Sequence, residues 1–214
     1  MRLCLLSDLP LSATPGNPAI TAAEIFPAYV AFLSQQGHEV YWLSTPALLH
    51  APVIQAALLP ATAELMPTTC RYVMPVQAYW YAGARLLCIP LELWQRVDMH
   101  TRLFTFLCLL HRARACTLFH AWSTLPIAYL TVYTARYLAL PAIVSCPADT
   151  PEPGPADVFR QDWTAQHAAA YVVHSPAVSP AGLDLARLHV INPAQARASQ
   201  TLLALYRRFE TTAP

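Results

Sequence analysis

The 214-residue sequence contains no lysine, and all 13 of its basic residues are arginine. Charged residues make up 12% of the chain, about half of the usual share, and the formal net charge is +1. The arginines are scattered, and the closest clusters are Arg112 with Arg114 and Arg207 with Arg208. Nucleic-acid binding requires a basic patch or stripe, so we predict that no nucleic acid is a partner.

Cysteine spacing and apolar runs exclude two further classes. None of the six cysteines forms a Cys-x-x-Cys pair, so we predict no metal site and interpret the thiols as reduced, buried groups of a cytoplasmic protein. The most apolar helical stretch, residues 102–110, is too short to cross a bilayer. No secretory signal is evident at the first strand. Peripheral contact with a membrane surface stays open.

Several cofactor and catalytic motifs are also missing. The sequence has no P-loop, no Gly-x-Gly-x-x-Gly dinucleotide loop and no Gly-x-Ser-x-Gly nucleophile elbow. These motifs supply backbone amides to phosphates or present a reactive serine. We therefore predict no bound cofactor and no serine-hydrolase chemistry.

What the sequence does have is apolar residues, which make up 56% of the chain. Together with the scarcity of charge, this indicates a surface that a second copy, a partner protein or a membrane face covers. A compositional bias toward Ala, Leu, Pro and Arg explains the same numbers, and both interpretations stay open.

Short apolar runs alternate with helical stretches along the chain. The expected strands are residues 2–7, 38–44, 70–76, 116–122, 141–147, 170–175 and 188–192. The expected helices are residues 19–37, 89–113, 125–140, 157–169, 179–186 and 198–210. Strands that are apolar throughout and alternate with helices predict an α/β fold, a Rossmann-like parallel sheet with helices on both faces. In such sheets ligands bind beyond the carboxyl ends of the strands.

Five phrases, in order, resemble the N-terminal half of retaining glycosyltransferases of the GT-B fold, family 4 type. They are QGHEVYWLS (36–44), LFHAW (118–122), LALPAIVSC (138–146), AAAYVVHSPAVSPAGL (168–183) and RLHVINP (187–193). The resemblance implies a Rossmann-like domain over residues 1–193. It also implies that the second domain of this family, which binds the nucleotide sugar, is missing here.

The stretch at 198–210 resembles the final helix of complete family members. Leu202, Leu205, Tyr206 and Phe209 fall at i, i+3, i+4 and i+7, which makes one apolar stripe. We expect residues 194–214 to form a helix that packs back on the same domain. An ordinary terminal helix of an α/β fold would show the same stripe.

The resemblance also suggests site residues. His120 matches the first histidine of the family's His-x-His phrase and is a weak catalytic candidate, while Trp122 replaces the second. The loop with Gly16 and Asn17 matches the ligand-facing loop, although Pro18 removes an amide donor there. Asp8 and Asp149 are candidate acceptor-side groups, and we name no confident catalytic residue.

Three functions remain in competition. The first is a glycosyltransferase-like pseudoenzyme that is inactive alone and serves as a binding or assembly module. The second is the acceptor-binding half of a split transferase, which another chain completes and which meets a sugar or nucleotide sugar only in that complex. The third is an unrelated small α/β enzyme. The missing second histidine favours the first over the second, and the missing phosphate loop counts against the third.

Overall fold

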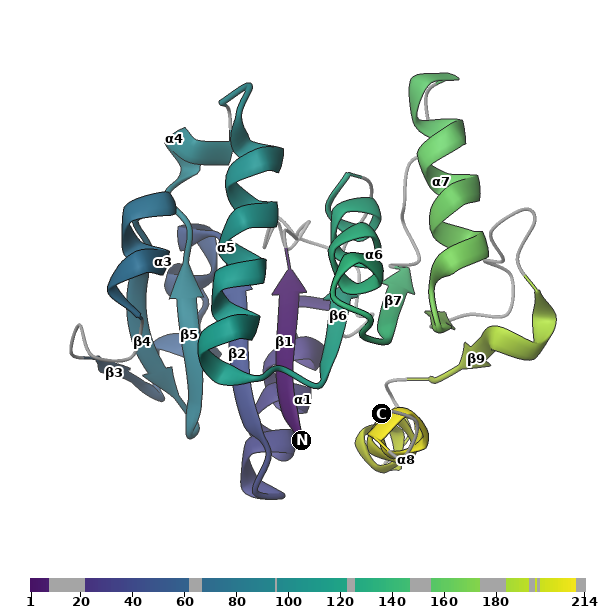
Figure 1. Cartoon of the computed structure of the whole chain (residues 1–214). Helices are drawn as coiled ribbons and strands as arrows, with labels where there is room; N and C mark the ends of the chain where they lie inside the picture. Colours follow the sequence, from purple (N-terminus) through teal and green to yellow (C-terminus); the bar gives the residue numbers. More distant parts are fainter. Residues whose placement is uncertain are drawn as a thin grey trace. The chain divides into compact units, whose positions relative to one another are not determined.

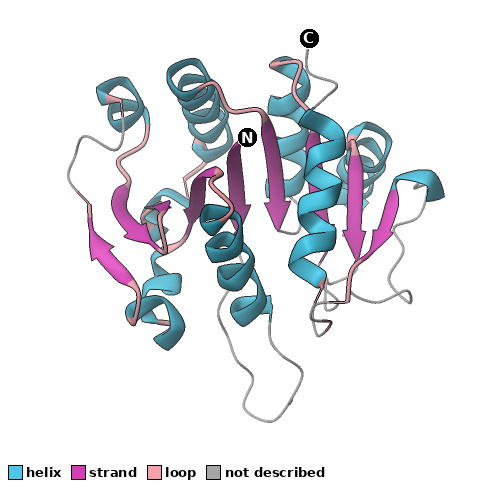
Figure 2. Cartoon of the chain, turned by 90° about the horizontal axis from the view of Figure 1, so that it is seen from below, coloured by secondary structure: helices cyan, strands magenta, loops and turns pink. Residues whose placement is uncertain are grey.

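The computed structural model describes residues 1–7, 22–61, 67–94, 96–122, 126–146, 155–173, 184–192, 195 and 197–210. The chain forms two compact units, Met1–Cys116 and Thr117–Pro214. Each unit has its own strands, and helices flank them (Figure 2). The predicted boundary near residue 193 stays a prediction.

The described residues of the first unit form five strands, together with several helices. Its strands are β1 (Arg2–Ser7), β2 (Glu39–Ser44), β3 (Leu58–Pro60), β4 (Gln77–Tyr81) and β5 (Ala84–Cys88). Its helices are α1 (Ala22–Gln35), η1 (Pro46–His50), α2 (Pro52–Gln55), α3 (Thr68–Val73), α4 (Leu91–Trp94) and α5 (Met99–Arg114). The strand order is β3-β4-β5-β2-β1, and α1 and α5 lie on opposite faces (Figure 1).

Burial explains the central strands of this unit. Residues 3–6 of β1 and 40–43 of β2 are each at most 2% exposed. Side chains of a strand alternate between the two faces, so full burial of consecutive residues means that both faces are covered. The two strands pair in parallel, with Arg2 opposite Glu39 and Leu6 opposite Leu43. This confirms the parallel, doubly covered strands expected from the sequence.

The outer part of the same sheet corrects the prediction of a purely parallel sheet. Strand β5 pairs in parallel with β2, but β4 pairs antiparallel with both β5 and β3. A two-residue turn joins β4 to β5, and its residues Ala82 and Gly83 have φ angles of +47° and +86°. Positive φ at both central positions gives the twist that a tight hairpin needs. The sheet is therefore mixed.

The predicted strand at residues 70–76 is also wrong. This segment forms helix α3 (Thr68–Val73), and Cys70 and Met74 are both 0% exposed. Cys70 lies within the helix, and the amide of Met74, the residue that follows the helix, donates to the carbonyl of Cys70 at 3.0 Å. The apolar run was short, and periodicity alone does not separate a buried strand from one buried turn of helix.

Among its described residues, the second unit has four parallel strands in the order β6-β7-β8-β9. Its elements are β6 (Leu118–Trp122), α6 (Ile127–Tyr137), β7 (Ala142–Cys146), α7 (Pro155–His167), β8 (Ala170–Val173), η3 (Leu185–Arg187), β9 (Leu188–Val190) and α8 (Ala198–Glu210). The alternation of strands and helices confirms the predicted Rossmann-type α/β fold. The predicted helix at 179–186 falls largely outside the described residues.

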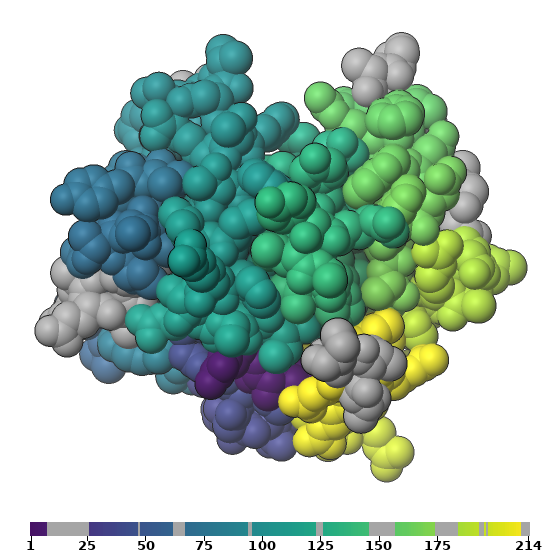
Figure 3. All heavy atoms as spheres, in the orientation of Figure 1, coloured from purple at the N-terminus to yellow at the C-terminus, as the bar shows by residue number. Residues whose placement is uncertain are grey.

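The final helix α8 packs against the sheet of the second unit. Leu202, Leu205 and Tyr206 of the predicted apolar stripe are at most 4% exposed, and Leu203 is buried as well. Helix α8 contacts β6. In the space-filling view its yellow atoms border the yellow-green β9 segment (Figure 3). The helix thus covers apolar surface of its own unit.

Candidate functional site

His120 lies near the carboxyl end of β6 in a closed hydrogen-bond network. Its side chain is 0% exposed. Its Nε2 is 2.8 Å from Oγ of Ser145 on β7, and its Nδ1 is hydrogen-bonded to the hydroxyl of Tyr206 on α8. Ser145 is also 0% exposed. Both ring nitrogens therefore have partners, as a buried imidazole requires.

Trp122, two residues further along β6, is also completely buried. Its ring centroid is 6.2 Å from that of His120. The structure thus brings these two predicted site residues together, but in the interior, where neither presents a surface to a ligand. The other predicted site residues, Asp8, Gly16, Asn17 and Asp149, lie outside the described part of the chain.

The first unit carries a separate polar network at the ends of β1 and β2. The indole Nε1 of Trp42 donates to Oγ of Ser7 at 2.9 Å, and that hydroxyl donates to Oγ of Ser44 at 3.0 Å. Ser7 and Ser44 are 6% and 2% exposed. These two hydrogen bonds link the ends of β1 and β2 to one another and to the indole.

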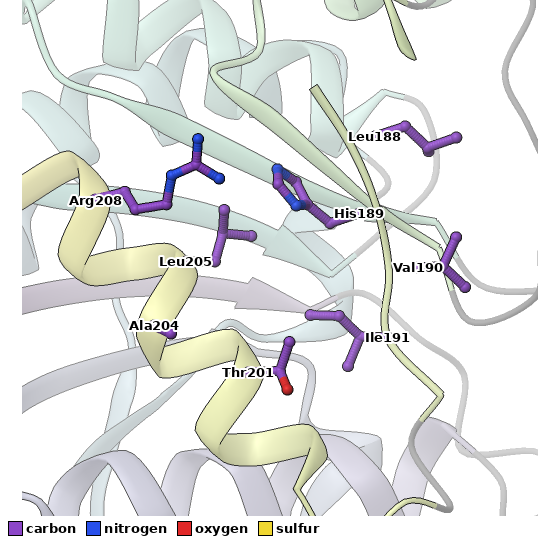
Figure 4. A pocket seen from close by; sticks show the side chains of 8 residues that line it. All are labelled: Leu188, His189, Val190, Ile191, Thr201, Ala204, Leu205 and Arg208. Carbon is purple, nitrogen blue, oxygen red and sulfur yellow. The ribbon is translucent and has the colours of Figure 1, made fainter. Parts of the chain in front are cut away.

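A pocket of about 340 Å³ lies between α8 and β9 in the second unit. We call it the α8–β9 pocket, and it is lined by Leu188, His189, Val190, Ile191, Thr201, Ala204, Leu205 and Arg208. The helix contributes its residues at i, i+3, i+4 and i+7, which share one face. The side chains of Arg208 and His189 point toward one another at one end, and Thr201 and Ile191 lie at the other (Figure 4).

The environment of His189 lowers its pKa below the ordinary value. Burial is the larger cause, because it disfavours the charged imidazolium, and the nearby charge of Arg208 adds to it. At neutral pH His189 is therefore a neutral imidazole that can offer one N–H. Arg208 supplies the permanent positive charge of the pocket.

Sequence reasoning missed this pocket. The sequence feature that could have indicated it is a second helical stripe, made of Thr201, Ala204, Leu205 and Arg208. Each of these residues comes one position before a residue of the buried stripe. The pocket also requires β9 to lie beside α8, and no motif in the sequence specifies that these two elements are neighbours.

Three features limit the chemistry that is open to the described residues. Among them, no group of three or more His, Cys, Asp or Glu side chains is arranged to hold a metal ion. Cys4, Cys70, Cys88 and Cys116 are buried free thiols, which confirms the prediction for these four, and Cys108 is half-buried. No helix in the described ranges has both the length and the hydrophobicity to cross a bilayer.

Comparison with known proteins adds a structural likeness. No family model matches the chain, and no curated protein matches it. A crystal structure of a glycosyltransferase from Rickettsia africae ESF-5 is similar in fold, with a TM-score of 0.52 and 9% sequence identity. The likeness covers 100% of this chain and 51% of that one. This chain therefore has a glycosyltransferase-like Rossmann-type fold and spans about half the length of that protein.

Proposed function

We propose that this chain is a glycosyltransferase-like half that acts as a binding or assembly module and does not transfer sugars by itself. The observation that carries the proposal is that His120, which matches the first histidine of the family's His-x-His motif, is buried with both ring nitrogens hydrogen-bonded. A general base must reach the proton that it abstracts. His120 has both nitrogens engaged and no exposed surface.

The extent of the structural likeness supports the same proposal. Transfer in the GT-B fold takes place in a cleft between two domains, which positions the substrates and excludes water. The described residues contain no second domain of this kind, and the likeness covers 51% of the glycosyltransferase from Rickettsia africae ESF-5. A half of this size would provide a shelf for an acceptor or a partner, while the positive groups that stabilise a leaving diphosphate in this fold come from the second domain.

Exposed aromatic residues of the second unit support a binding role. Tyr133 and Tyr137 on α6 are 45% and 70% exposed, and Phe159 on α7 is 69% exposed. Tyr133 also packs near Trp163 of α7, with ring centroids 6.0 Å apart. Aromatic side chains are enriched at protein interfaces. We infer that a second copy of this chain covers these rings, which is one of the two expected coverings, a second copy or a partner protein.

The test has two parts. The purified chain is incubated with UDP-glucose and GDP-mannose, and released nucleotide is measured; we expect no release above the rate without protein. Native mass spectrometry then measures the assembly. A homo-oligomer that dissociates in the Tyr137→Ser/Phe159→Ser variant supports the module, whereas donor turnover by the chain alone overturns it.

A second candidate, the acceptor half of a split transferase, is favoured by the half-length likeness. Its test is the native complex purified from the source. A companion chain that carries a nucleotide-sugar domain and restores turnover would support it. In that complex, loss of turnover in the His120→Phe variant without a loss of stability in urea denaturation would indicate a catalytic role of this histidine, and loss of both would indicate a structural role.

A further inference from the structure

Helices α6 and α7 of the second unit pack side by side (Figure 1). The strands β6, β7 and β8 follow one another both in the sheet and in the chain, so two right-handed crossovers place both helices on the same face of the sheet and in the same direction. Aromatic rings join them. The ring centroid of Trp163 on α7 is 5.2 Å from that of Tyr129 and 6.0 Å from that of Tyr133, both on α6.

The side of these two helices that points away from the sheet forms one surface, which we call the α6–α7 face. Its exposed residues include Tyr133, Arg136 and Tyr137 on α6 and Phe159, Asp162 and Gln166 on α7. They recur at intervals of three and four, the spacing of one helical face. Three of the six are aromatic and between 45% and 70% exposed. Rings gathered in this way indicate a surface that another molecule covers.

The α6–α7 face carries two opposite charges in diagonal positions. Arg136 is three residues after Tyr133, and Asp162 is one residue before Trp163. Because Trp163 contacts the rings of both Tyr129 and Tyr133, its level along the helix pair falls between them. Arg136 therefore lies more than one turn further along the common direction than Asp162.

We propose that two copies of this chain meet at their α6–α7 faces about a two-fold axis between the helices, so that Arg136 of each copy pairs with Asp162 of the other. The inference rests on the proposed function, in which a second copy covers the same rings, and it adds the arrangement of the two copies. Such an axis exchanges α6 with α7 and reverses their direction. It brings the positive charge on α6 onto the negative charge on α7, twice in each dimer.

The charge balance of the face favours a second copy over a membrane surface. Arg160 and Asp157 neutralise each other on α7, with 2.9 Å between their nearest atoms. Neither Arg136 nor Asp162 forms an ion pair with another described residue. The face is thus neutral as a whole, whereas anionic lipids attract clusters of basic residues. A neutral face with opposite charges in diagonal positions is complementary to its own two-fold copy.

Charge reversal tests this pairing on the whole chain. Arg136→Asp makes both charges of the face acidic, and Asp162→Arg makes both basic. Loss of one exposed ion pair changes little, but like charges placed opposite each other repel, so reversal is more informative than truncation. Arg207→Asp is the matched control, because it changes the net charge equally at an exposed position of α8. Circular dichroism confirms the fold of each variant.

Native mass spectrometry and sedimentation velocity measure the assembly of each variant alone and of mixtures. We expect the unsubstituted chain to be a dimer, each reversal to weaken it by about tenfold or more, and Arg207→Asp to leave it unchanged. An equimolar mixture of Arg136→Asp and Asp162→Arg should form a heterodimer, because both contacts then join opposite charges. Its mass equals that of the unsubstituted dimer and differs from that of either variant homodimer.

The pairing is overturned if the unsubstituted chain is monomeric, if the reversals leave the dimer intact, or if the mixture gives no heterodimer. A dimer that resists both reversals would leave the binding module standing with another arrangement of its copies. Turnover of a nucleotide sugar by the chain alone would instead overturn the proposed function and leave the heterodimer result unaffected. The two failures are therefore distinguishable.

Discussion

The hydroxyl of Tyr206, in the last helix, is hydrogen-bonded to Nδ1 of His120, 86 residues earlier in the chain. The two rings also meet edge to face, with centroids 5.6 Å apart. Tyr206 is 0% exposed, like His120. The contact joins α8 to β6 by a polar bond inside an apolar interface, so the helix has one preferred position along the strand.

Replacement of Tyr206 by phenylalanine should lower the free energy of unfolding by about 1–3 kcal/mol. The ring still fills its site, but the His120 nitrogen loses its buried partner. Urea denaturation measures the loss. Tyr137→Phe is the control, since Tyr137 is 70% exposed and its change should stay within about 0.5 kcal/mol. Equal effects of the two variants would contradict the proposed importance of the bond.

We predict opposite effects on stability for substitutions at the two residues of the β4–β5 turn. Gly83→Ala should destabilise the chain by about 1–2 kcal/mol, because its φ of +86° disfavours a Cβ. That Cβ would also lie 2.6 Å from Oγ of Ser34. Ala82→Asn should stabilise by about 0.5 kcal/mol, because asparagine tolerates positive φ. Shifts of the same sign in urea denaturation would argue against the turn geometry.

The ionisation of Glu39 makes the stability of the fold depend on pH in the acidic range. Its burial raises its pKa, but the hydrogen bond from Tyr41 (2.5 Å) and the charges of Arg85, Arg2 and Arg114 outweigh this and lower it below the ordinary 4.5. A carboxyl with a lowered folded-state pKa stabilises the fold above its unfolded pKa, and this stabilisation is lost as the pH falls through the folded value.

Glu39→Gln should therefore be less stable than the unsubstituted chain by about 1–2 kcal/mol near pH 7. The difference should shrink as the pH falls below the unfolded-state pKa of about 4.3 and through the lower folded-state pKa. Urea denaturation across this range tests the sign. A difference that stays constant with pH would mean that the charge of Glu39 is not what stabilises the fold.

The buried thiols should resist alkylation. Burial raises the pKa of Cys88 to about 12 and, as the main cause, that of Cys116 to about 12, so almost no thiolate forms near pH 8. Iodoacetamide should label both only after unfolding, while half-buried Cys108 should react first. Mass spectrometry of the native and urea-treated chain gives the order. Native labelling of Cys88 at the rate of Cys108 would show that its strand opens.

Much of the fold could be predicted from the sequence. Buried strands such as 2–7 and 141–147 stood out because consecutive apolar residues between helices mean two covered faces. The β4–β5 hairpin was missed because its turn is Ala82–Gly83 and not the usual Asn-Gly, and because its strands contain Trp and Tyr in a weakly alternating pattern.

The candidate site was harder to predict. The motif placed His120 in a strand correctly, as the third of the five residues of β6, but its partners Tyr206 and Ser145 come from other elements, and no spacing in the sequence shows that they reach it. The α8–β9 pocket likewise depends on the packing of a helix against a strand that precedes it by only a few residues. Contacts of this kind arise from tertiary packing, which local patterns do not encode.

The three-residue strand β3 has a consequence for aggregation. It is the outermost strand of the first unit's sheet, and Pro60, opposite Tyr79, has no amide hydrogen to offer to a further strand. An edge this short that ends in proline is a poor template for the addition of a strand from another molecule. Fibril growth from this edge is therefore disfavoured even though Leu59 is 64% exposed.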